Sequence, residues 1–205
     1  MFKQEAYWIR EALSGINASG QKKAANLGSS TLQFRTTVQP HIQEQLIAPL
    51  ERNGWQVCHM DMKAEDGVDV IADVSDPGMA TRFKDQFTLT ICTNMLEHVA
   101  DIGLVARNLM SITADGGYIL ISVPYRYRIH HDPIDNGFRP TPGEILALFP
   151  SAQITCVAKA IISITDPFYY GIKKSRFPLW GYRERIAFFL GKRHKVSGVL
   201  FRVKK

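Results

Sequence analysis

The chain has 205 residues, of which 45% are hydrophobic and 21% are charged. These values are typical of one soluble globular domain and exclude a disordered chain, a collagen-like fibre and a coiled coil. No stretch approaches the roughly 18 apolar residues of a membrane span, and the N-terminal residues do not form a secretory signal. The three widely spaced cysteines, Cys58, Cys92 and Cys156, predict reduced thiols in the cytoplasm.

The net charge of +6 is unevenly distributed along the chain. Residues 173–205 carry eleven Lys or Arg and one Glu, whereas the remainder has an excess of acidic residues. Aromatic and basic side chains alternate over 165–195, which we expect to be a helical insertion. It could pack as a lid on the core, or bind an anionic membrane surface or a lipid-linked substrate. We do not expect nucleic acid as a partner, because the acidic body would oppose a long binding track.

Predicted helices and strands alternate along a single domain that spans 1–205. Helical spacing of apolar residues predicts an N-terminal helix over 2–16, within the segment 1–20. The core, 22–158, contains predicted strands at 22–27, 55–62, 68–72, 87–92, 118–123 and 153–164, and helices at 40–52, 102–112 and from 142 onward. A capping box, Thr141 to Glu144, marks the start of the third of these helices. The last strand is predicted at 196–203.

Strands that are apolar throughout and separated by helices predict an α/β fold, in which helices cover both faces of a mostly parallel sheet. The carboxyl ends of such strands meet at one edge of the sheet, and ligands bind there. The residues that directly follow each strand are therefore the first candidates for function. They are 28–31, Asp61, Asp73, 93–98 and 124–131.

The most specific pattern lies between Phe87 and Pro124. A strand leads into Thr-Asn-Met-Leu-Glu-His-Val at 93–99, followed by a helix, the turn 114–117 (Ala-Asp-Gly-Gly) and a strand that ends near proline. This arrangement resembles the second half of a class I S-adenosylmethionine-dependent methyltransferase domain of the type 11-like group. The segment 94–99 also resembles quinone-biosynthesis methyltransferases. The resemblance extends over roughly 22–158, and implies a Rossmann-like seven-stranded sheet with an antiparallel C-terminal strand, and S-adenosyl-L-methionine as cofactor.

On this resemblance, cofactor-binding residues are expected after three of the strands. They are Gly28, Ser29, Ser30, Asp61, Asp73, Asn94 and Met95. Asp61 would bind the ribose hydroxyls and Asp73 would lie beside the adenine. The first loop departs from the family, because Asn26 and three hydroxyl residues, 29–31, replace its acidic residue and several glycines. Either the serines and Arg35 replace the contacts of the glycine turn, or cofactor binding is weakened or lost.

Three residues are candidates for catalysis. Histidine is the side chain suited to proton transfer near neutral pH, so His98 and His130 could accept a proton from the methyl acceptor, and Tyr125 could orient that acceptor. A structural hydrogen bond at the turn is the alternative for His98. A solvated loop is the alternative for His130.

The loop 124–140 is long, polar and aromatic, and lies where this family binds the acceptor. Its candidate substrate-binding residues are Arg126, Arg128, His131 and Arg139, of which the arginines could hold a phosphate or a carboxylate. The mixture of His and Asp would also suit a metal ion. Metal-binding loops are a small minority, so no metal is predicted.

The leading hypothesis is methyl transfer from S-adenosylmethionine to a small-molecule acceptor, or to one linked to a lipid or sugar. The location would be cytoplasmic, with the inner face of a membrane as an option. The alternative is a catalytically inactive, methyltransferase-like binding or scaffold protein.

Overall fold

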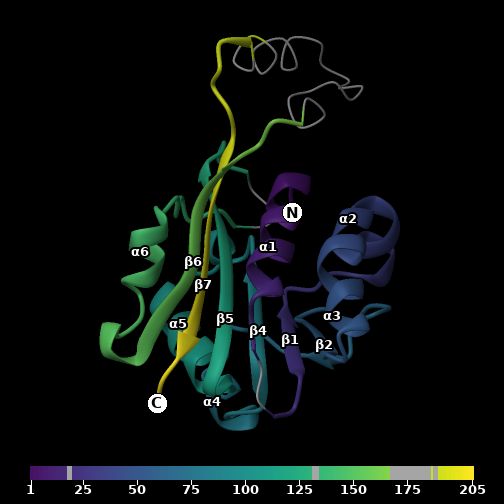
Figure 1. The fold of residues 1–205 in the computed structure, drawn as a ribbon, viewed down its shortest axis with the longest axis vertical. Coiled ribbons are helices and arrows are strands. Elements are labelled where there is room, and N and C mark those ends of the chain that lie inside the picture. Colours follow the sequence, from purple (N-terminus) through teal and green to yellow (C-terminus); the bar gives the residue numbers. More distant parts are fainter. Residues whose placement is uncertain (18–19, 131–133, 167–185, 187–188) are drawn as a thin grey trace.

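The computed structural model describes residues 1–17, 20–130, 134–166, 186 and 189–205. Within these residues, seven strands form one sheet in the order β3-β2-β1-β4-β5-β7-β6 (Figure 1). The strands are β1 (Lys23–Leu27), β2 (Gln56–Asp61), β3 (Val70–Ile71), β4 (Phe87–Thr93), β5 (Thr113–Arg126), β6 (Ile154–Ser163) and β7 (Lys195–Val203). All seven correspond to predicted strands. Six of them differ from the prediction only by small shifts at their ends, and β5 is considerably longer than predicted.

The pairing of the strands confirms a mostly parallel sheet with an antiparallel C-terminal strand. Strands β1 to β5 pair in parallel with one another, whereas β7 runs antiparallel to both β5 and β6. The strand order reverses between β1 and β4, which are neighbours in the sheet. In an open α/β sheet such a reversal creates a crevice outside the carboxyl ends of the strands.

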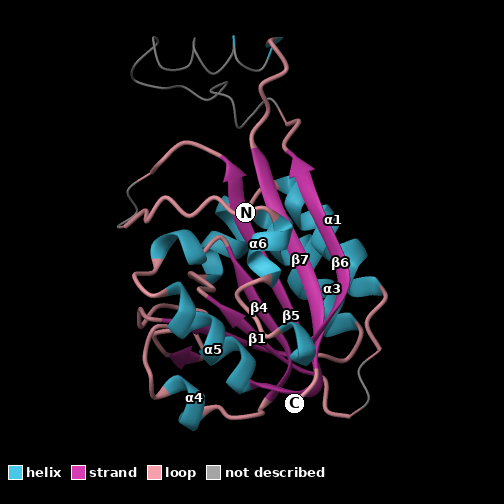
Figure 2. Ribbon diagram, turned by 90° about the vertical axis from the view of Figure 1, so that its left-hand side faces the viewer, coloured by secondary structure: helices cyan, strands magenta, loops and turns pink. Residues whose placement is uncertain are grey.

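Helices cover both faces of the sheet, as predicted (Figure 2). They are α1 (Lys3–Ser14), α2 (Pro40–Ile42), α3 (Ala48–Arg52), α4 (Met79–Arg82), α5 (Ile102–Ile112) and α6 (Pro142–Leu146). Alternate residues of β5 point to opposite faces. Ile119 and Ile121 pack with α4, α5 and α6, whereas Leu120 packs with α1 and with the helical run 40–52. Two cores therefore hold the sheet between them.

Side-chain caps start two of the helices, and the capping box predicted from the sequence is the one at α6. The Asp101 side chain accepts a hydrogen bond from the Leu104 N–H at 2.8 Å, at the start of α5. At the start of α6, the Thr141 N–H donates to Glu144 Oε2 at 2.7 Å, and the Glu144 N–H donates to Thr141 Oγ1 at 3.3 Å. The α-helix itself ends at Leu146, earlier than the apolar pattern suggests.

Three further elements differ from their predictions. The helix predicted over 40–52 is one helical run, but its middle, Gln43–Ile47, is π-helical. Strand β5 continues through Gly116 and Gly117: its pairing with β4 shifts register between Phe87 and Leu89, and Gly116 has a positive φ. The short helix α4 was not predicted, since four residues carry no periodic signal. Most of the predicted insertion 165–195 lies outside the described residues.

Among the described residues, no helix is both long enough and apolar enough to cross a membrane.

Candidate functional site

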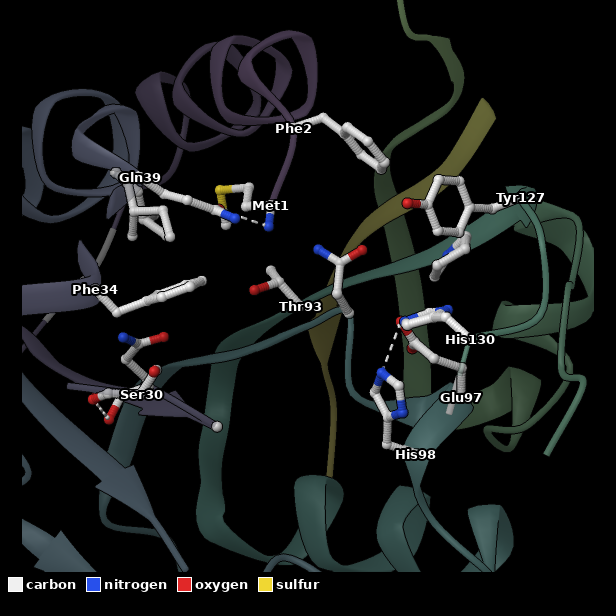
Figure 3. Close-up of a pocket in the computed structure, with 17 residues that line it drawn as sticks. Met1, Phe2, Ser30, Phe34, Gln39, Thr93, Glu97, His98, Tyr127 and His130 are labelled. Carbon is white, nitrogen blue, oxygen red and sulfur yellow. Dashed lines mark hydrogen bonds and ion pairs between the residues drawn. The ribbon is translucent and has the colours of Figure 1, made fainter. Parts of the chain in front are cut away.

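A cavity of about 410 Å³ opens at the carboxyl ends of β1, β4 and β5 (Figure 3). Its lining comes from segments far apart in the chain: Met1, Phe2, Asn26, Gly28, Ser29, Ser30, Phe34, Gln39, Ile42, Leu46, Thr93, Asn94, Glu97, His98, Pro124, Tyr127 and His130. This is the edge at which the sequence predicted a ligand. Two parts of the lining carry most of its polar groups. We call Gly28 to Ser30, with the Arg35 and Asp61 side chains that bind them, the loop wall. The histidine wall is Glu97, His98, Tyr127 and His130.

The loop wall keeps the backbone shape of a glycine turn despite its serines. Gly28 has a φ of +64°, and a Cβ added there would lie 2.9 Å from Met95 Sδ. Ser30 has a φ of +56°, in the left-handed region that favours glycine. A serine therefore occupies a conformation for which glycine is the usual choice.

Arg35 holds this turn from behind. Its side chain is 1% exposed and donates to the Ser29 and Ser30 carbonyls at 3.1 and 2.6 Å. It also donates to the Gly67 carbonyl at 2.9 Å, which ties the turn to the segment after β2. Of the two alternatives for the degenerate loop, these contacts favour the one in which Arg35 supports the turn.

Asp61 also serves the turn. Its Oδ2 accepts the Ser30 N–H at 2.9 Å and its Oδ1 accepts the Lys63 N–H at 3.2 Å. The carboxylate therefore lies against the loop, although Asp61 is not among the residues that line the cavity. Asp73 is exposed, accepts the Ser75 N–H at 2.8 Å and is likewise absent from the lining. Of these two acids, the structure brings only Asp61 next to the Gly28–Ser30 turn.

Asn26 occupies the end of β1 where the family usually has an acidic residue. It is 5% exposed, and its Nδ2 lies 3.1 Å from His59 Nδ1. Burial, reinforced by the charge of Arg35, lowers the pKa of His59 to about 4. At neutral pH the imidazole is therefore uncharged and can accept the hydrogen bond from the amide.

A buried carboxylate that the sequence reasoning missed ties α1 to the site. Glu5 is fully buried, and its Oε1 accepts from Asn94 Nδ2 at 2.7 Å and from Ser122 Oγ at 2.6 Å. Its Oε2 accepts the Phe2 N–H at 2.9 Å. These bonds place the start of α1 over the ends of β4 and β5. The available signal was the position of Glu5: it is an acidic residue on the apolar face of the predicted helix, four residues before Ile9.

The histidine wall contains the most perturbed acid of the cavity. Glu97 is 1% exposed, its Oε1 lies 3.7 Å from His98 Nε2, and burial raises its pKa to about 7. Its Oε2 has no hydrogen-bond partner among the described residues. His98 Nδ1 forms a short hydrogen bond with the Ile134 carbonyl. The His98 and His130 rings stand at right angles, 5.0 Å apart, and Tyr127 packs edge-on against His130.

The structure brings two of the three predicted catalytic residues together. His98 and His130 both line the cavity and point toward Glu97 (Figure 3). Tyr125 does not line the cavity, whereas Tyr127 does. The pairing of β5 with β7 shifts register between Pro124 and Arg126, which changes the alternation of side chains beyond the proline. The sequence carries no clear signal for such a shift.

The arginines of the loop 124–140 do not line the cavity. Arg126 and Arg128 are exposed, and His131 lies outside the described residues. Arg139 donates to both oxygens of Asp135, at 3.1 and 2.6 Å, and holds the pKa of that carboxyl well below its usual range. It also donates to the Tyr127 carbonyl at 3.4 Å. Arg139 therefore organises the loop that carries His130.

The fold and the position of the cavity are those of a class I methyltransferase domain. Residues 43–184 match the sequence profile of a family described as a methyltransferase domain. Because the match spans more than half of the chain, the chain belongs to this family, and its enzyme class is that of the S-adenosylmethionine-dependent methyltransferases. The matched region begins after the Gly28 loop. A search of curated proteins finds no match.

Several solved structures share the fold. Geranyl diphosphate C-methyltransferase from Streptomyces coelicolor A3(2), in complex with Mg²⁺, geranyl diphosphate and S-adenosyl-L-homocysteine, is 11% identical with a TM-score of 0.65, over 97% of this chain and 77% of that one. A geranyl diphosphate methyltransferase in complex with S-adenosylmethionine is 11% identical with a TM-score of 0.62, over 98% and 85%. The [4+2]-cyclase SpnF is 11% identical with a TM-score of 0.60, over 97% and 80%. At these identities the likeness concerns the fold alone.

Proposed function

We propose that the chain binds S-adenosylmethionine between the loop wall and Asn94, and transfers its methyl group to an acceptor bound against the histidine wall. The acceptor would be a small molecule or a group linked to a lipid or sugar. One observation carries the proposal: loops after β1, β4 and β5 converge on a single cavity of about 410 Å³. This volume falls in the range of about 300–1,000 Å³ that is typical of small-molecule sites.

The residues of the loop wall fit such a cofactor. Each oxygen of Asp61 accepts one backbone N–H, so both oxygens retain lone pairs for the hydroxyls of a ribose. When bound, S-adenosylmethionine supplies an electrophilic methyl group on a positively charged sulfur. The buried carboxylate of Glu97, which lines the cavity, and that of Glu5, which lies behind Asn94, favour a cation nearby. Met95, packed under Gly28, would support the turn from below.

The histidine wall would position the acceptor and remove its proton. An in-line displacement requires the acceptor atom to lie opposite the sulfur, and orientation of this kind can contribute up to about 7–11 kcal/mol. Glu97, His98 and His130 stand together at the end of the cavity away from the loop wall (Figure 3). An acceptor oxygen or nitrogen bound next to them would lie beside the groups that can accept its proton.

Calorimetry with S-adenosylhomocysteine tests the cofactor site. We expect saturable binding, and we expect Asp61→Ala to weaken it by about 1–3 kcal/mol through the loss of charged hydrogen bonds. The exposed Glu51→Ala is the matched control and should leave the affinity unchanged. If millimolar ligand produced no heat of binding and no thermal shift, the proposal would be overturned. Asp73→Ala tests whether this exposed acid also contributes.

The degenerate first loop favours a second candidate, a binding or scaffold protein without catalysis. Asn26 and the strained Ser30 stand where the family has an acid and glycine. Turnover of a labelled methyl donor separates the two functions. Cofactor binding with no turnover on any acceptor would favour the scaffold.

The basic and aromatic segment 165–195 supports an anionic membrane surface as a partner, and a cytoplasmic location at such a surface. Flotation with anionic vesicles tests this contact. Protein that stays wholly in the soluble fraction would remove it.

A further inference from the structure

We propose that Glu97, His98 and His130 form a binding site for a divalent transition-metal ion, with open coordination positions that face the cavity. One ligand atom from each residue, a carboxylate oxygen or a ring nitrogen, lies within 4.8 Å of the other two. Glu97 and His98 come from the turn after β4, and His130 comes from the loop after β5. The set is thus assembled only by the fold, and the sequence indicated a metal only through the mixture of His and Asp in the loop 124–140.

An unpartnered carboxylate oxygen is the first reason to place a cation here. Glu97 Oε2 is buried and has no hydrogen-bond partner among the described residues. The contact of Glu97 Oε1 with His98 Nε2, at 3.7 Å, is too long for a hydrogen bond. A buried carboxylate oxygen without a partner is unfavourable, and a bound cation would remove this penalty.

The partners of the two histidines are those that metal-binding histidines use. His98 Nδ1 is bonded to the Ile134 carbonyl, so it carries the proton and leaves the Nε2 lone pair directed toward Glu97. His130 Nδ1 lies 3.3 Å from Asp135 Oδ2, and Arg139 fixes that carboxylate. Ligating histidines generally turn their second nitrogen to a carbonyl or a carboxylate, which fixes the ring and raises its basicity.

The donor set selects the class of metal. Two imidazoles and one carboxylate suit Zn²⁺, Fe²⁺, Co²⁺ or Ni²⁺, whereas Mg²⁺ and Ca²⁺ prefer oxygen ligands. Three protein ligands leave a further position for water or substrate, as in catalytic zinc sites. The His98 and His130 side chains are 21% and 32% exposed and line the cavity, so that position would face the acceptor. Metal–ligand distances of about 2.0–2.2 Å require the three side chains to move slightly closer together.

A metal ion at this place would define the acceptor more closely, and this step rests on the proposed function. An acceptor with two neighbouring oxygen atoms could occupy the open positions. Metal binding lowers the pKa of a hydroxyl, which then loses its proton to solvent instead of to His98 or His130, because these would be bound to the metal. The oxygen forms the new bond to the methyl carbon, and the carbon–sulfur bond breaks with its electron pair going to sulfur.

Cobalt titration of untagged, chelator-treated protein tests the site. We expect one Co²⁺ per chain, with visible absorption bands that Zn²⁺ abolishes by displacement. Glu97→Gln, His98→Ala and His130→Ala should each weaken Co²⁺ binding at least tenfold. His41→Gln is the control, because His41 is a buried histidine outside the cavity lining, bonded to the Met1 carbonyl. Circular dichroism and thermal melts verify that each variant is folded.

Three results would overturn the inference: no saturable uptake of Co²⁺ or Zn²⁺, uptake of Mg²⁺ alone, or equal affinity in the three cluster variants and the control. Calorimetry with S-adenosylhomocysteine on the same samples separates this inference from the proposed function. Binding of S-adenosylhomocysteine without metal uptake would refute the metal site only. Metal uptake without binding of S-adenosylhomocysteine would refute the proposed function but not the metal site.

Discussion

The two walls of the cavity differ in where their charged groups find partners. In the loop wall, Arg35 and Asp61 are engaged by the backbone of Ser29 and Ser30, and Arg35 Nε is the atom left over. In the histidine wall, Glu97 Oε2 is buried without a hydrogen-bond partner among the described residues, and His130 Nδ1 has only its ionic contact with Asp135 Oδ2 at 3.3 Å. Buried polar groups are nearly always satisfied in folded proteins. The charged groups of the loop wall are therefore held mainly by bonds formed on folding, whereas the histidine wall keeps a buried carboxylate oxygen that a ligand could bind.

Replacing Arg35 should produce the largest effect, because it removes the support of the loop wall. Arg35→Met leaves three carbonyls without their charged donor, and we expect a loss of about 3 kcal/mol or more in the free energy of unfolding. Affinity for S-adenosylhomocysteine should fall as the turn loosens. Urea denaturation and calorimetry measure the two effects.

The control for this experiment is Arg10→Met. Arg10 is an exposed arginine whose side chain donates to Gln45 Oε1 at 2.7 Å, so its loss should change stability by less than about 0.5 kcal/mol. If the two variants were equally stable, Arg35 would not be the support of the loop wall.

Removing charge from the histidine wall should raise the free energy of unfolding, whereas replacing Arg35 lowers it. Glu97 has a raised pKa of about 7, so its contribution to stability is present at low pH and is lost as the pH rises through 7. Glu97→Gln should therefore stabilise chelator-treated protein at pH 8, by about 2–3 kcal/mol from the shift, while methyl transfer falls. Thermal and urea unfolding at pH 8 measure the gain.

Glu5→Gln is a matched control, since Glu5 is equally buried but accepts three hydrogen bonds. That variant should be destabilised. A loss of stability in both variants would mean that Glu97 already has its partners without a ligand.

The pH dependence of stability should also separate the walls. His59, behind Asn26, has its pKa lowered to about 4. The unfolded chain binds the proton first, so stability falls as the pH drops from about 6.5 to 4. Glu97 acts in the reverse direction over a similar window, since its stabilisation is lost as the pH rises toward 7.

The contributions of His59 and Glu97 to the pH dependence of stability oppose each other in the native chain. Replacing either residue should therefore reveal the contribution of the other. Relative to the native protein, Glu97→Gln should lose stability on acidification more steeply, and His59→Gln less steeply. The His59 contribution should be about 1–2 kcal/mol, because solvent screens its partly exposed ring. Denaturation curves between pH 4 and 7.5 test this, and parallel curves for the three proteins would contradict it.

The sequence predicted the sheet well, because buried parallel strands appear as continuous apolar runs between helices. It also placed Gly28, Asn94 and His98 at one edge of the sheet, from their positions after strands. It missed Glu5, whose partners lie 89 and 117 residues away in the chain. It missed Tyr127, since a register shift in β5 is set by pairing with β7. Local patterns identify the elements, whereas tertiary contacts decide which side chains meet.

The smallest expected effect concerns Ser30, the strained residue of the loop wall. Ser30→Gly relieves a left-handed backbone worth about 1–2 kcal/mol, and the greater freedom of glycine in the unfolded chain offsets about 0.5–1 kcal/mol of this gain. We expect stability to change by less than about 1 kcal/mol and cofactor affinity to stay the same, since Arg35 and Asp61 already fix the turn. Gly28→Ala, at φ +64°, should be destabilised and is the control of opposite sign. A tenfold gain in S-adenosylhomocysteine affinity in Ser30→Gly would mean that the serine impairs binding, and would favour the scaffold function over catalysis.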